Sequence, residues 1–330
     1  MGRPITLFTG QWADLPFETV CEKAAGWGYD GLEIACWGDH LDVREAASDP
    51  AYIAAKLEIL KKYNLKCWAI GAHLAGQCVG DQADERHDAF APDEAKGNPE
   101  KIRAWAVEEM KAAARAAKAL GCGVVTGFMG SPIWKAWYSF PPATEEMIEA
   151  GFQKILGLWT PILDEFDAAG VRFALEVHPT EIAFDLYTAA RLLRVFKNRS
   201  ALGFNFDPSH LLWQGLKPHL FIREFPARIY HVHIKDAAVT MDGKAGLLGS
   251  HLPFGDLRRG WNFHSPGHGD VDFGSIIREL NAVGYRGPLS VEWEDNGMDR
   301  EFGAPEARAY VASINFAPSA IAFDKDMKTR

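Results

Sequence analysis

The sequence predicts an α/β protein folded as a (β/α)8 TIM barrel. Short apolar runs alternate eight times with longer amphipathic segments along the 330 residues, a pattern typical of parallel strands joined by helices. Glycines stand where four of the expected helices end, at Gly28, Gly121, Gly170 and Gly284, as a left-handed helix stop requires. A doubly wound open sheet is the alternative. No G-x-G-x-x-G sequence or P-loop follows any expected strand, and we therefore favour the closed barrel.

The elements follow one another regularly. The expected strands are residues 5–10, 29–36, 65–73, 122–130, 171–179, 201–210, 228–236 and 287–295. The expected helices are residues 15–28, 50–64, 99–121, 144–170, 185–198, 217–227, 272–285 and 304–316. The segment 99–121 has the strongest helix propensity because it is rich in alanine. No low-complexity linker interrupts the eight units, so we expect a single domain over residues 1–330.

Three segments that follow strands are too long to be simple connections. They are residues 74–98, 131–143 and 237–268. In a barrel they would lie at the carboxyl ends of the strands, which is the face that carries the active site. Their aromatic residues suit the faces of sugar rings, or else only pack the segments down. These residues are Trp134, Trp137, Tyr138, Trp261 and Phe263.

Composition excludes several classes of partner. The net charge of −9 and the pI near 5.7 disfavour binding to nucleic acid or to an anionic membrane. No stretch approaches eighteen apolar residues, and the N-terminus lacks the apolar region of a signal peptide. The five cysteines are scattered and form no metal or redox motif, which indicates a reducing compartment. We expect a cytoplasmic protein with no membrane or nucleic-acid partner, and a homo-oligomer is left open.

The last four expected strands each end in a residue that can ligate a divalent cation. These residues are Glu176, Asp207, His233 and Glu292. Because neighbouring strands lie about 4.8 Å apart, the four ends fall within ~10 Å at one side of the barrel mouth. Three carboxylates would repel one another there unless a 2+ ion held them. An oxygen-rich site with one nitrogen suits Mn, Mg or Co and tolerates Zn. We expect one divalent ion, with Mn before the others.

Two further side chains would point to the same mouth. His73 ends the third expected strand and Glu33 ends the second. We expect both to contact substrate hydroxyl groups, although each has a structural role as its alternative.

The C-terminal half carries a family resemblance. The stretches "ALEVHP", "FNFDPSH", "YHVHIKD", "GHGDVDFGSII" and "YRGPLSVEWED" resemble the xylose-isomerase-like barrel superfamily of sugar-phosphate isomerases and epimerases. That superfamily includes D-tagatose 3-epimerases, hydroxypyruvate isomerases, inosose dehydratases and endonuclease IV. The count of eight units extends the resemblance over the whole chain.

The resemblance implies roles for individual residues. The superfamily's metal ligands would be Glu176, Asp207, His233 and Glu292, and His210 would bind a substrate oxygen. Glu176 and Glu292 would also be the acid/base pair, one on each face of the substrate. This chemistry is consistent with a metal that chelates a carbonyl and its neighbouring hydroxyl while a carboxylate removes the proton between them.

The chain also departs from the epimerase pattern. An arginine expected shortly after the strand-seven histidine is missing, and Lys235, Asp236 and the 237–268 segment with Arg258 stand in its place as candidate substrate contacts. His178 follows Glu176 by two residues and so faces the same way. It is an extra candidate base, as in lyase-like members, or else it hydrogen-bonds a ligand carboxylate.

These observations predict a divalent-metal-dependent isomerase or epimerase of a sugar or sugar derivative, acting through a metal-stabilised enediolate. The main alternative is a dehydratase or lyase that uses the same site on a keto-sugar, a keto-polyol or a glycoside. An endonuclease of the endonuclease IV kind is disfavoured, since the fourth expected strand ends "GFMGS" without histidine. A non-catalytic subunit is disfavoured because the ligand set is intact.

Overall fold

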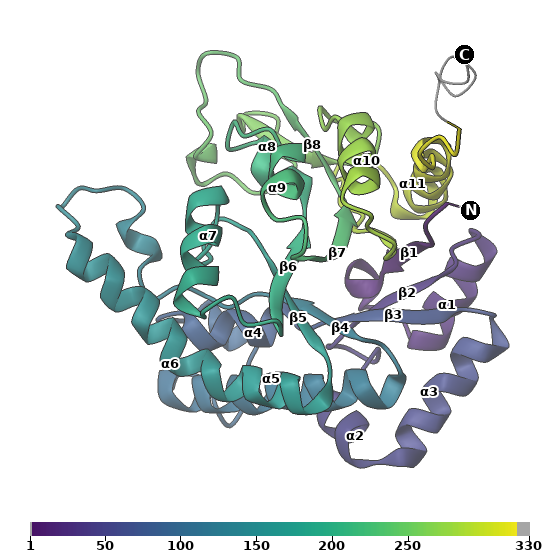
Figure 1. The fold of residues 1–330 in the computed structure, drawn as a ribbon, viewed down its shortest axis with the longest axis horizontal. Helices are drawn as coiled ribbons and strands as arrows, with labels where there is room; N and C mark the ends of the chain where they lie inside the picture. The colour runs from purple at the N-terminus through teal and green to yellow at the C-terminus, as the bar shows by residue number, and fades with distance from the viewer. Residues whose placement is uncertain (1, 322–330) are drawn as a thin grey trace, which may run out of the picture.

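A closed barrel of parallel strands forms the centre of the molecule (Figure 1). The computed structural model describes residues 2–321. Around the barrel the strand order is β1-β10-β7-β6-β5-β4-β3-β2, and each neighbouring pair is parallel. The barrel strands are β1 (Ile5–Phe8), β2 (Gly31–Ala35), β3 (Lys66–Gly71), β4 (Val124–Gly127), β5 (Arg172–Glu176), β6 (Leu202–Phe206), β7 (Ile229–Ile234) and β10 (Leu289–Val291). The predicted (β/α)8 barrel is confirmed.

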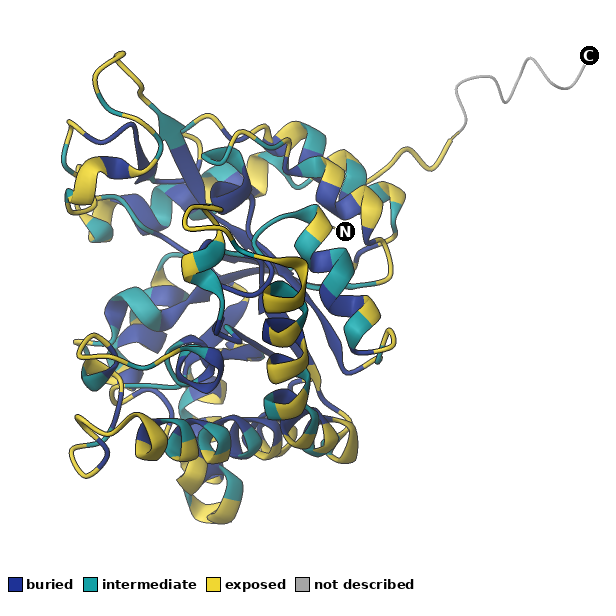
Figure 2. Ribbon diagram, turned by 90° about the vertical axis from the view of Figure 1, so that its left-hand side faces the viewer, coloured by how far each residue is buried: buried dark blue, intermediate teal, exposed yellow. Residues whose placement is uncertain are grey.

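Helices surround the barrel, and each helix buries one of its sides against the strands. Figure 2 shows buried strands inside a ring of helices whose outer sides are exposed. Each of the eight expected helices has its counterpart, in α1 (Phe17–Gly26), α3 (Pro50–Lys62), α5 (Pro99–Leu120), α6 (Glu145–Ala169), α7 (Leu186–Val195), α9 (His219–Glu224), α10 (Phe273–Ala282) and α11 (Arg300–Ile314). Three further short helices were not predicted, namely α2 (Val43–Ser48), α4 (His73–Gly80) and α8 (Pro208–Leu212).

The helix boundaries have local causes in the sequence. Asn98 caps α5 by accepting hydrogen bonds from two backbone amides of its first turn, which would otherwise lack partners. The predicted glycine stops are confirmed, since Gly28, Gly121, Gly170 and Gly284 all adopt φ between 71° and 82°. Only glycine takes this conformation without steric cost.

Helix α4 begins at His73, the last residue of the third expected strand, and covers the first residues of the segment 74–98, which was expected to be a loop. Two glycines lower its helix propensity, and both are needed for packing. A Cβ on Gly76 would lie 2.1 Å from the carbonyl oxygen of Phe128, and one on Gly80 would lie 2.4 Å from that of Met129. Tertiary contact with the chain after β4 therefore stabilises a helix that local propensity does not predict.

The segment 237–268 is also more ordered than a loop. Its ends form an antiparallel pair, β8 (Asp236–Val239) with β9 (Trp261–His264). The indole of Trp261 stacks on Trp213 with ring centroids 4.4 Å apart and planes within 4°, and its Nε1 donates to the carbonyl of Leu247. This hairpin places aromatic side chains above the barrel mouth.

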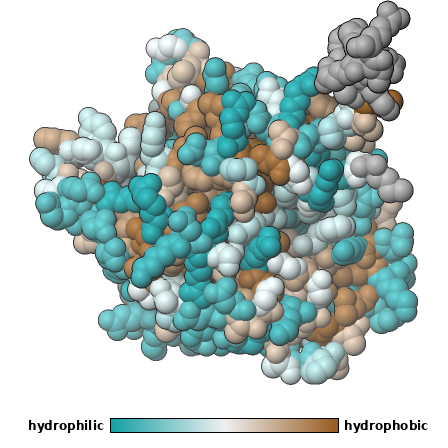
Figure 3. All heavy atoms as spheres, in the orientation of Figure 1, coloured by the Kyte–Doolittle hydropathy of each residue, from teal (hydrophilic) through white to brown (hydrophobic). Residues whose placement is uncertain are grey.

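Membrane-spanning potential and thiol reactivity can be assessed over residues 2–321. Among residues 2–321 no helix is both long enough and apolar enough to cross a bilayer. All five cysteines are free thiols, and burial raises the pKa of Cys21 and of Cys78 to about 12, which suppresses the reactive thiolate. Hydrophilic and hydrophobic residues are interspersed on the face drawn in Figure 3.

Candidate active site

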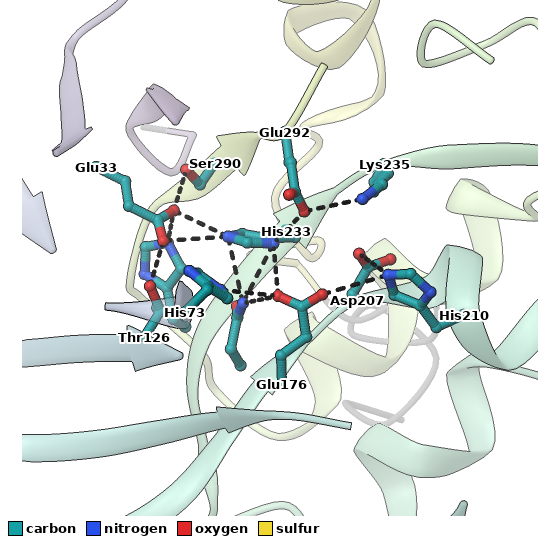
Figure 4. A network of polar contacts seen from close by, with 12 residues as sticks. Glu33, His73, Thr126, Glu176, Asp207, His210, His233, Lys235, Ser290 and Glu292 are labelled. Carbon is teal, nitrogen blue, oxygen red and sulfur yellow. Dashed lines mark hydrogen bonds and ion pairs between the residues drawn. The ribbon is translucent and has the colours of Figure 1, made fainter. Parts of the chain in front are cut away.

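Four ligand-type residues meet at the carboxyl ends of the barrel strands (Figure 4). Glu176 is the last residue of β5, Asp207 follows β6, His233 lies in β7 and Glu292 follows β10. All four side chains are buried. One ligand atom from each lies within 4.8 Å of the others, so the structure brings together the cluster that the sequence analysis singled out.

His233 lies at the centre of this cluster. Its Nε2 is 3.0 Å from Oε2 of Glu33, and its Nδ1 is 2.8 Å from Glu292 Oε2 and 3.2 Å from Glu176 Oε2. A carboxylate can only accept a hydrogen bond, so the proton on Nε2 is donated to Glu33. Burial opposes the charged form of this ring, but Glu33 and Glu292 raise the pKa of His233 well above its ordinary value. With a cation bound at Nδ1, the proton that remains on Nε2 would keep the ring in the tautomer that a metal ligand needs.

Glu33 differs from the expectation for it, because it lies below the cavity rather than in its wall. It is fully buried and accepts hydrogen bonds from Thr126, His231 and Ser290 as well as from His233. Burial by itself would raise the pKa of Glu33, but the charges of His233 and His231 hold it well below its ordinary value. A buried anion with four donors that does not line the cavity acts as a structural support, which was the alternative to a substrate contact.

Glu176 has a dense set of neighbours of its own. It accepts hydrogen bonds from His73 Nε2 at 3.2 Å and from Asn205 Nδ2 at 2.9 Å, both through Oε2. Its Oε1 lies 3.3 Å from His210 Nε2. Burial opposes ionisation of this carboxyl, but the imidazoles of His210, His233 and His73 hold its pKa well below the ordinary value. Glu176 is thus an anion beside the cavity.

Asp207 and Glu292 each present an oxygen that lacks a hydrogen-bond donor. Asp207 accepts from the amide and hydroxyl of Ser209 through Oδ1, while its Oδ2 has no hydrogen bond. Glu292 Oε2 lies 2.8 Å from His233 Nδ1 and 3.4 Å from Lys235 Nζ in ion pairs, but it likewise accepts no hydrogen bond. Burial raises the pKa of Asp207 to about 6 against the opposing charge of His210. Buried carboxylate oxygens without donors fit a bound cation, because unpaired they are costly.

Four further predicted residues line the cavity above the cluster. The rings of His178 and His210 are in edge-to-face contact at 4.1 Å, and Nδ1 of His178 is buried without a partner. Burial lowers the pKa of His178 well below its ordinary value, so the ring is neutral. Lys235 Nζ lies 3.0 Å from Glu294 Oε1 and 3.4 Å from Glu292 Oε2. His73 completes the wall on the side of β3.

The cavity itself has a volume of about 430 Å³ and is walled by aromatic rings. Trp261 and Phe263 of the hairpin line it, as expected from the sequence, whereas Trp134 lines a neighbouring cavity. Trp137 and Tyr138 are exposed and belong to neither lining. Further aromatic and polar residues of the wall were not predicted, namely Phe8, Gln11, Trp37, Phe128, Trp213 and Phe254.

Two candidate substrate contacts lie elsewhere. Asp236 points away from the cavity and accepts hydrogen bonds from four backbone amides, of residues 237, 267, 269 and 271, so it organises the turn before α10. Arg258 is exposed and pairs with Asp256. Alternation along a strand predicts the face on which a side chain lies. It predicts neither the turn at 265–271 that binds Asp236 nor the ion pair of Arg258.

Several supporting residues could not be found from single motifs. Asn205, Thr126 and Ser290 hold Glu176 and Glu33 in place. Each is a polar residue inside an otherwise apolar strand, and that is the one available signal. Their partners come from other strands and depend on the closure of the barrel.

Comparison with known proteins places this geometry in context. The family model described as xylose isomerase-like TIM barrel matches residues 21–317. The protein YfiH of Bacillus subtilis, whose function is uncharacterised, is 26% identical over 91% of this chain and 95% of its own length. An inosose dehydratase of Clostridium botulinum is 33% identical, but over only 28% of this chain and 30% of the dehydratase.

Solved structures agree on the architecture. The 3-keto-D-glucoside 4-epimerase YcjR of E. coli aligns with a TM-score of 0.67 over 94% of this chain and 99% of YcjR, at 13% identity. Identity this low establishes a shared fold alone. The similar proteins thus include sugar epimerases and dehydratases.

Proposed function

The chain belongs to the xylose isomerase-like TIM barrel family, and we propose that it is a divalent-metal-dependent isomerase or epimerase of a sugar or sugar derivative. The observation that carries this proposal is the buried cluster of Glu176, Asp207, His233 and Glu292 beneath an aromatic cavity. Titratable groups with shifted pKa values at the floor of a cleft are typical of catalytic sites. We also propose that residues 1–330 form one domain, because a single main hydrophobic cluster runs through the barrel and its helices. The hairpin adds only a small cluster, which meets the main one at Leu212.

The cluster fits one divalent cation. It offers three carboxylates and one imidazole, and two of the carboxylate oxygens have no hydrogen-bond donor. This donor set suits Mn first, with Mg, Co and Zn as alternatives. When bound, such an ion would polarise the carbonyl of a keto-sugar and stabilise the enediolate formed by loss of the neighbouring proton.

The residues around the cluster would divide the remaining tasks. Glu176 and Glu292 approach Nδ1 of His233 from different strands, and we assign them the removal and return of the proton. His73 and His210 hydrogen-bond or contact Glu176 and also face the cavity, so they can bind substrate oxygens. Lys235 would hold Glu292 ionised through its positive charge.

A second candidate is elimination at the same site, as a dehydratase or lyase. Nδ1 of His178 is buried, has no hydrogen-bond partner and belongs to a ring in the cavity wall. A neutral imidazole in that position can act as a base in addition to Glu176. Inosose dehydratases are among the similar proteins. Epimerisation needs no such additional base, so His178 is the residue that separates the two reactions.

Metal analysis tests the proposal first. Purified wild-type protein, Glu176→Gln and His233→Ala would be reconstituted with Mn²⁺, and the metal counted per chain. We expect about one ion per wild-type chain and none in His233→Ala. His268→Ala is a matched control, since this exposed histidine pairs only with Glu306 among the described residues. Absence of metal from reconstituted wild-type protein would contradict the metal site and the function together.

Proton exchange then tests the reaction. Keto-sugars would be incubated with the Mn²⁺-loaded protein in heavy water, and C–H loss beside the carbonyl followed by NMR. We expect exchange that depends on metal and is lost in Glu176→Gln. If the protein binds metal but exchanges no proton in any keto-sugar, the metal site is supported and the proposed isomerase activity is wrong.

A further inference from the structure

A second cavity of about 490 Å³ opens beside the first. It lies between the segment that follows α4 and the segment that follows β4, and its walls include Asp81, Gln82, Ser131 and Trp134. Both cavities fall within the usual size range of small-molecule sites, roughly 300–1,000 Å³. The proposed isomerase chemistry uses only the first, so the second is not explained by it.

The two cavities adjoin one another. Thr180 lines both, and the helix α4 borders both, with Leu74 at the first and Gln77 at the second. Thr180 adopts φ of 90°, a conformation that a β-branched residue rarely takes. Strained residues of this kind concentrate at ligand sites, where the surroundings hold them in place. The turn around it is closed by the amide of Glu181, which donates to the carbonyl of His178 at 3.0 Å.

The lining of the second cavity suits a polyhydroxylated ring. Trp134 is half-buried and is supported from the side by Phe184 in an edge-to-face contact at 5.4 Å. A fixed indole offers an apolar surface with a polar edge. Hydrogen-bond donors and acceptors also line this cavity. The amide of Gln77 donates to Asp81 Oδ2 at 2.9 Å, and Gln82 is exposed in the same lining.

The lysine and arginine side chains that line the two cavities are largely paired with carboxylates of the same linings. Arg86 forms a two-point ion pair with Asp84, and Lys235 lies between Glu292 and Glu294. Lys135 is the remaining lysine or arginine in the two linings and is exposed at the rim, 3.5 Å from Gln82 Oε1. A phosphate or carboxylate would find no buried lysine or arginine in these linings free to receive it, so an uncharged ligand is favoured.

We propose that the substrate is a neutral glycoside with two rings, the first held at the carboxylate cluster and the second against Trp134. This inference rests on the proposed function for the chemistry at the first ring. The second cavity is then a specificity site. Its contacts with the second ring raise the affinity for the ligand without taking part in proton transfer.

Binding of inert sugars tests the site without catalysis. The protein loaded with Mg²⁺ would be titrated with D-glucose and with a panel of neutral disaccharides that covers each glycosidic linkage, by calorimetry. Saturation-transfer NMR would report which ring contacts the protein. We expect at least one disaccharide to bind about tenfold more tightly than glucose, which corresponds to about 1.4 kcal/mol, with saturation of both rings.

Two variants assign the effect to the second cavity. In Trp134→Ala we expect the best disaccharide to fall to the affinity of glucose and its second ring to lose saturation. Tyr138→Ala is the matched control, because this aromatic residue lies on the same segment but lines neither cavity, and its affinities should match wild type. Thermal melting would verify that both variants fold.

The outcomes separate the two proposals. If no disaccharide binds more tightly than glucose, or if Trp134→Ala binds like wild type, the second site is wrong. If glucose 6-phosphate binds more tightly than every neutral sugar, the preference for an uncharged ligand is wrong. If disaccharides bind in a Trp134-dependent way but no keto-sugar exchanges a proton, the proposed isomerase activity is wrong and the two-ring site is supported.

Discussion

His233 and Glu33 form a buried pair at the floor of the barrel mouth, with Nε2 of the imidazole 3.0 Å from Oε2 of the carboxylate. Glu33 is itself fixed by Thr126, His231 and Ser290. The ring of His233 therefore has one orientation, with Nδ1 towards Glu292 and Glu176 (Figure 4). A carboxylate behind a metal-binding histidine fixes its tautomer and increases its basicity.

Glu33→Gln should weaken metal binding although Glu33 is not one of the proposed ligands. The amide removes the negative charge that stabilises the His233 proton and brings an NH₂ group among four donors. Loss of such a supporting group typically costs 10–100-fold in metal affinity, and we expect a Kd for Mn²⁺ raised by about that factor, measured by titration. Ser290→Ala keeps the charge and removes one donor, so its effect should be smaller. If Glu33→Gln and wild type bind Mn²⁺ with equal affinity, the His233–Glu33 pair contributes to packing and not to metal binding.

Removal of metal should lower the thermal stability of the protein. Without a cation, Glu176, Asp207 and Glu292 hold negative charge within a few ångströms of one another. A ligand at 100 times its Kd stabilises the native state by about 2.7 kcal/mol, which corresponds to several degrees in Tm for a chain of this size. We expect EDTA to lower the Tm of metal-loaded protein in a scanning calorimeter. His233→Ala is the control, and its Tm should not respond to Mn²⁺ or EDTA.

His178→Asn should distinguish isomerisation from elimination. The asparagine keeps a polar side chain next to His210 but cannot act as a base at neutral pH. If the reaction is epimerisation through Glu176 and Glu292, exchange of the C–H proton should persist within a few fold of wild type. If the reaction is elimination, we expect product formation to fall by about 10²–10⁴-fold. Mass spectrometry separates the two, because elimination changes the mass of the sugar.

The barrel could be predicted because its signals are local and repeated. Eight alternations of strand and helix, with glycines such as Gly121 and Gly170 at helix ends, each report on a few neighbouring residues. The carboxylate cluster could be predicted for a related reason. Once the strands are parallel, the carboxyl end of each reaches the same mouth, so Glu176, Asp207 and Glu292 must be close whatever the details of packing.

The features that could not be predicted depend on contacts between distant segments. Alternation along β2 gives the inward direction of Glu33 but not its depth, which follows from the stagger of strands around the barrel. Helix α4 contradicts the propensity of Gly76 and Gly80 because the chain after β4 packs directly on it. Asp236 was assigned to substrate, but amides of the turn at 267–271 bind its carboxylate instead.

Glu181→Gln should stabilise the protein above about pH 5. Burial, together with the negative charge of Asp81, raises the pKa of Glu181 well above its ordinary value, despite hydrogen bonds from the amides of Met129 and Gly130. The unfolded chain releases this proton near the ordinary glutamate pKa of about 4.3, whereas the native state retains it to higher pH. Stability is therefore lost as pH rises through this window.

The control of this effect follows from the same linkage. Urea unfolding at pH 8 should show Glu181→Gln more stable than wild type, because the native wild-type protein retains a proton that the unfolded chain has lost. The glutamine oxygen can still accept from Met129 and Gly130, and the advantage should shrink towards pH 4, where wild-type Glu181 is protonated in both states. Glu85→Gln removes the same charge from an exposed position and should shift stability little at either pH. A Glu181→Gln protein that is less stable than wild type at pH 8 would mean that the two amides hold the carboxylate ionised, which would reverse the sign of the shift.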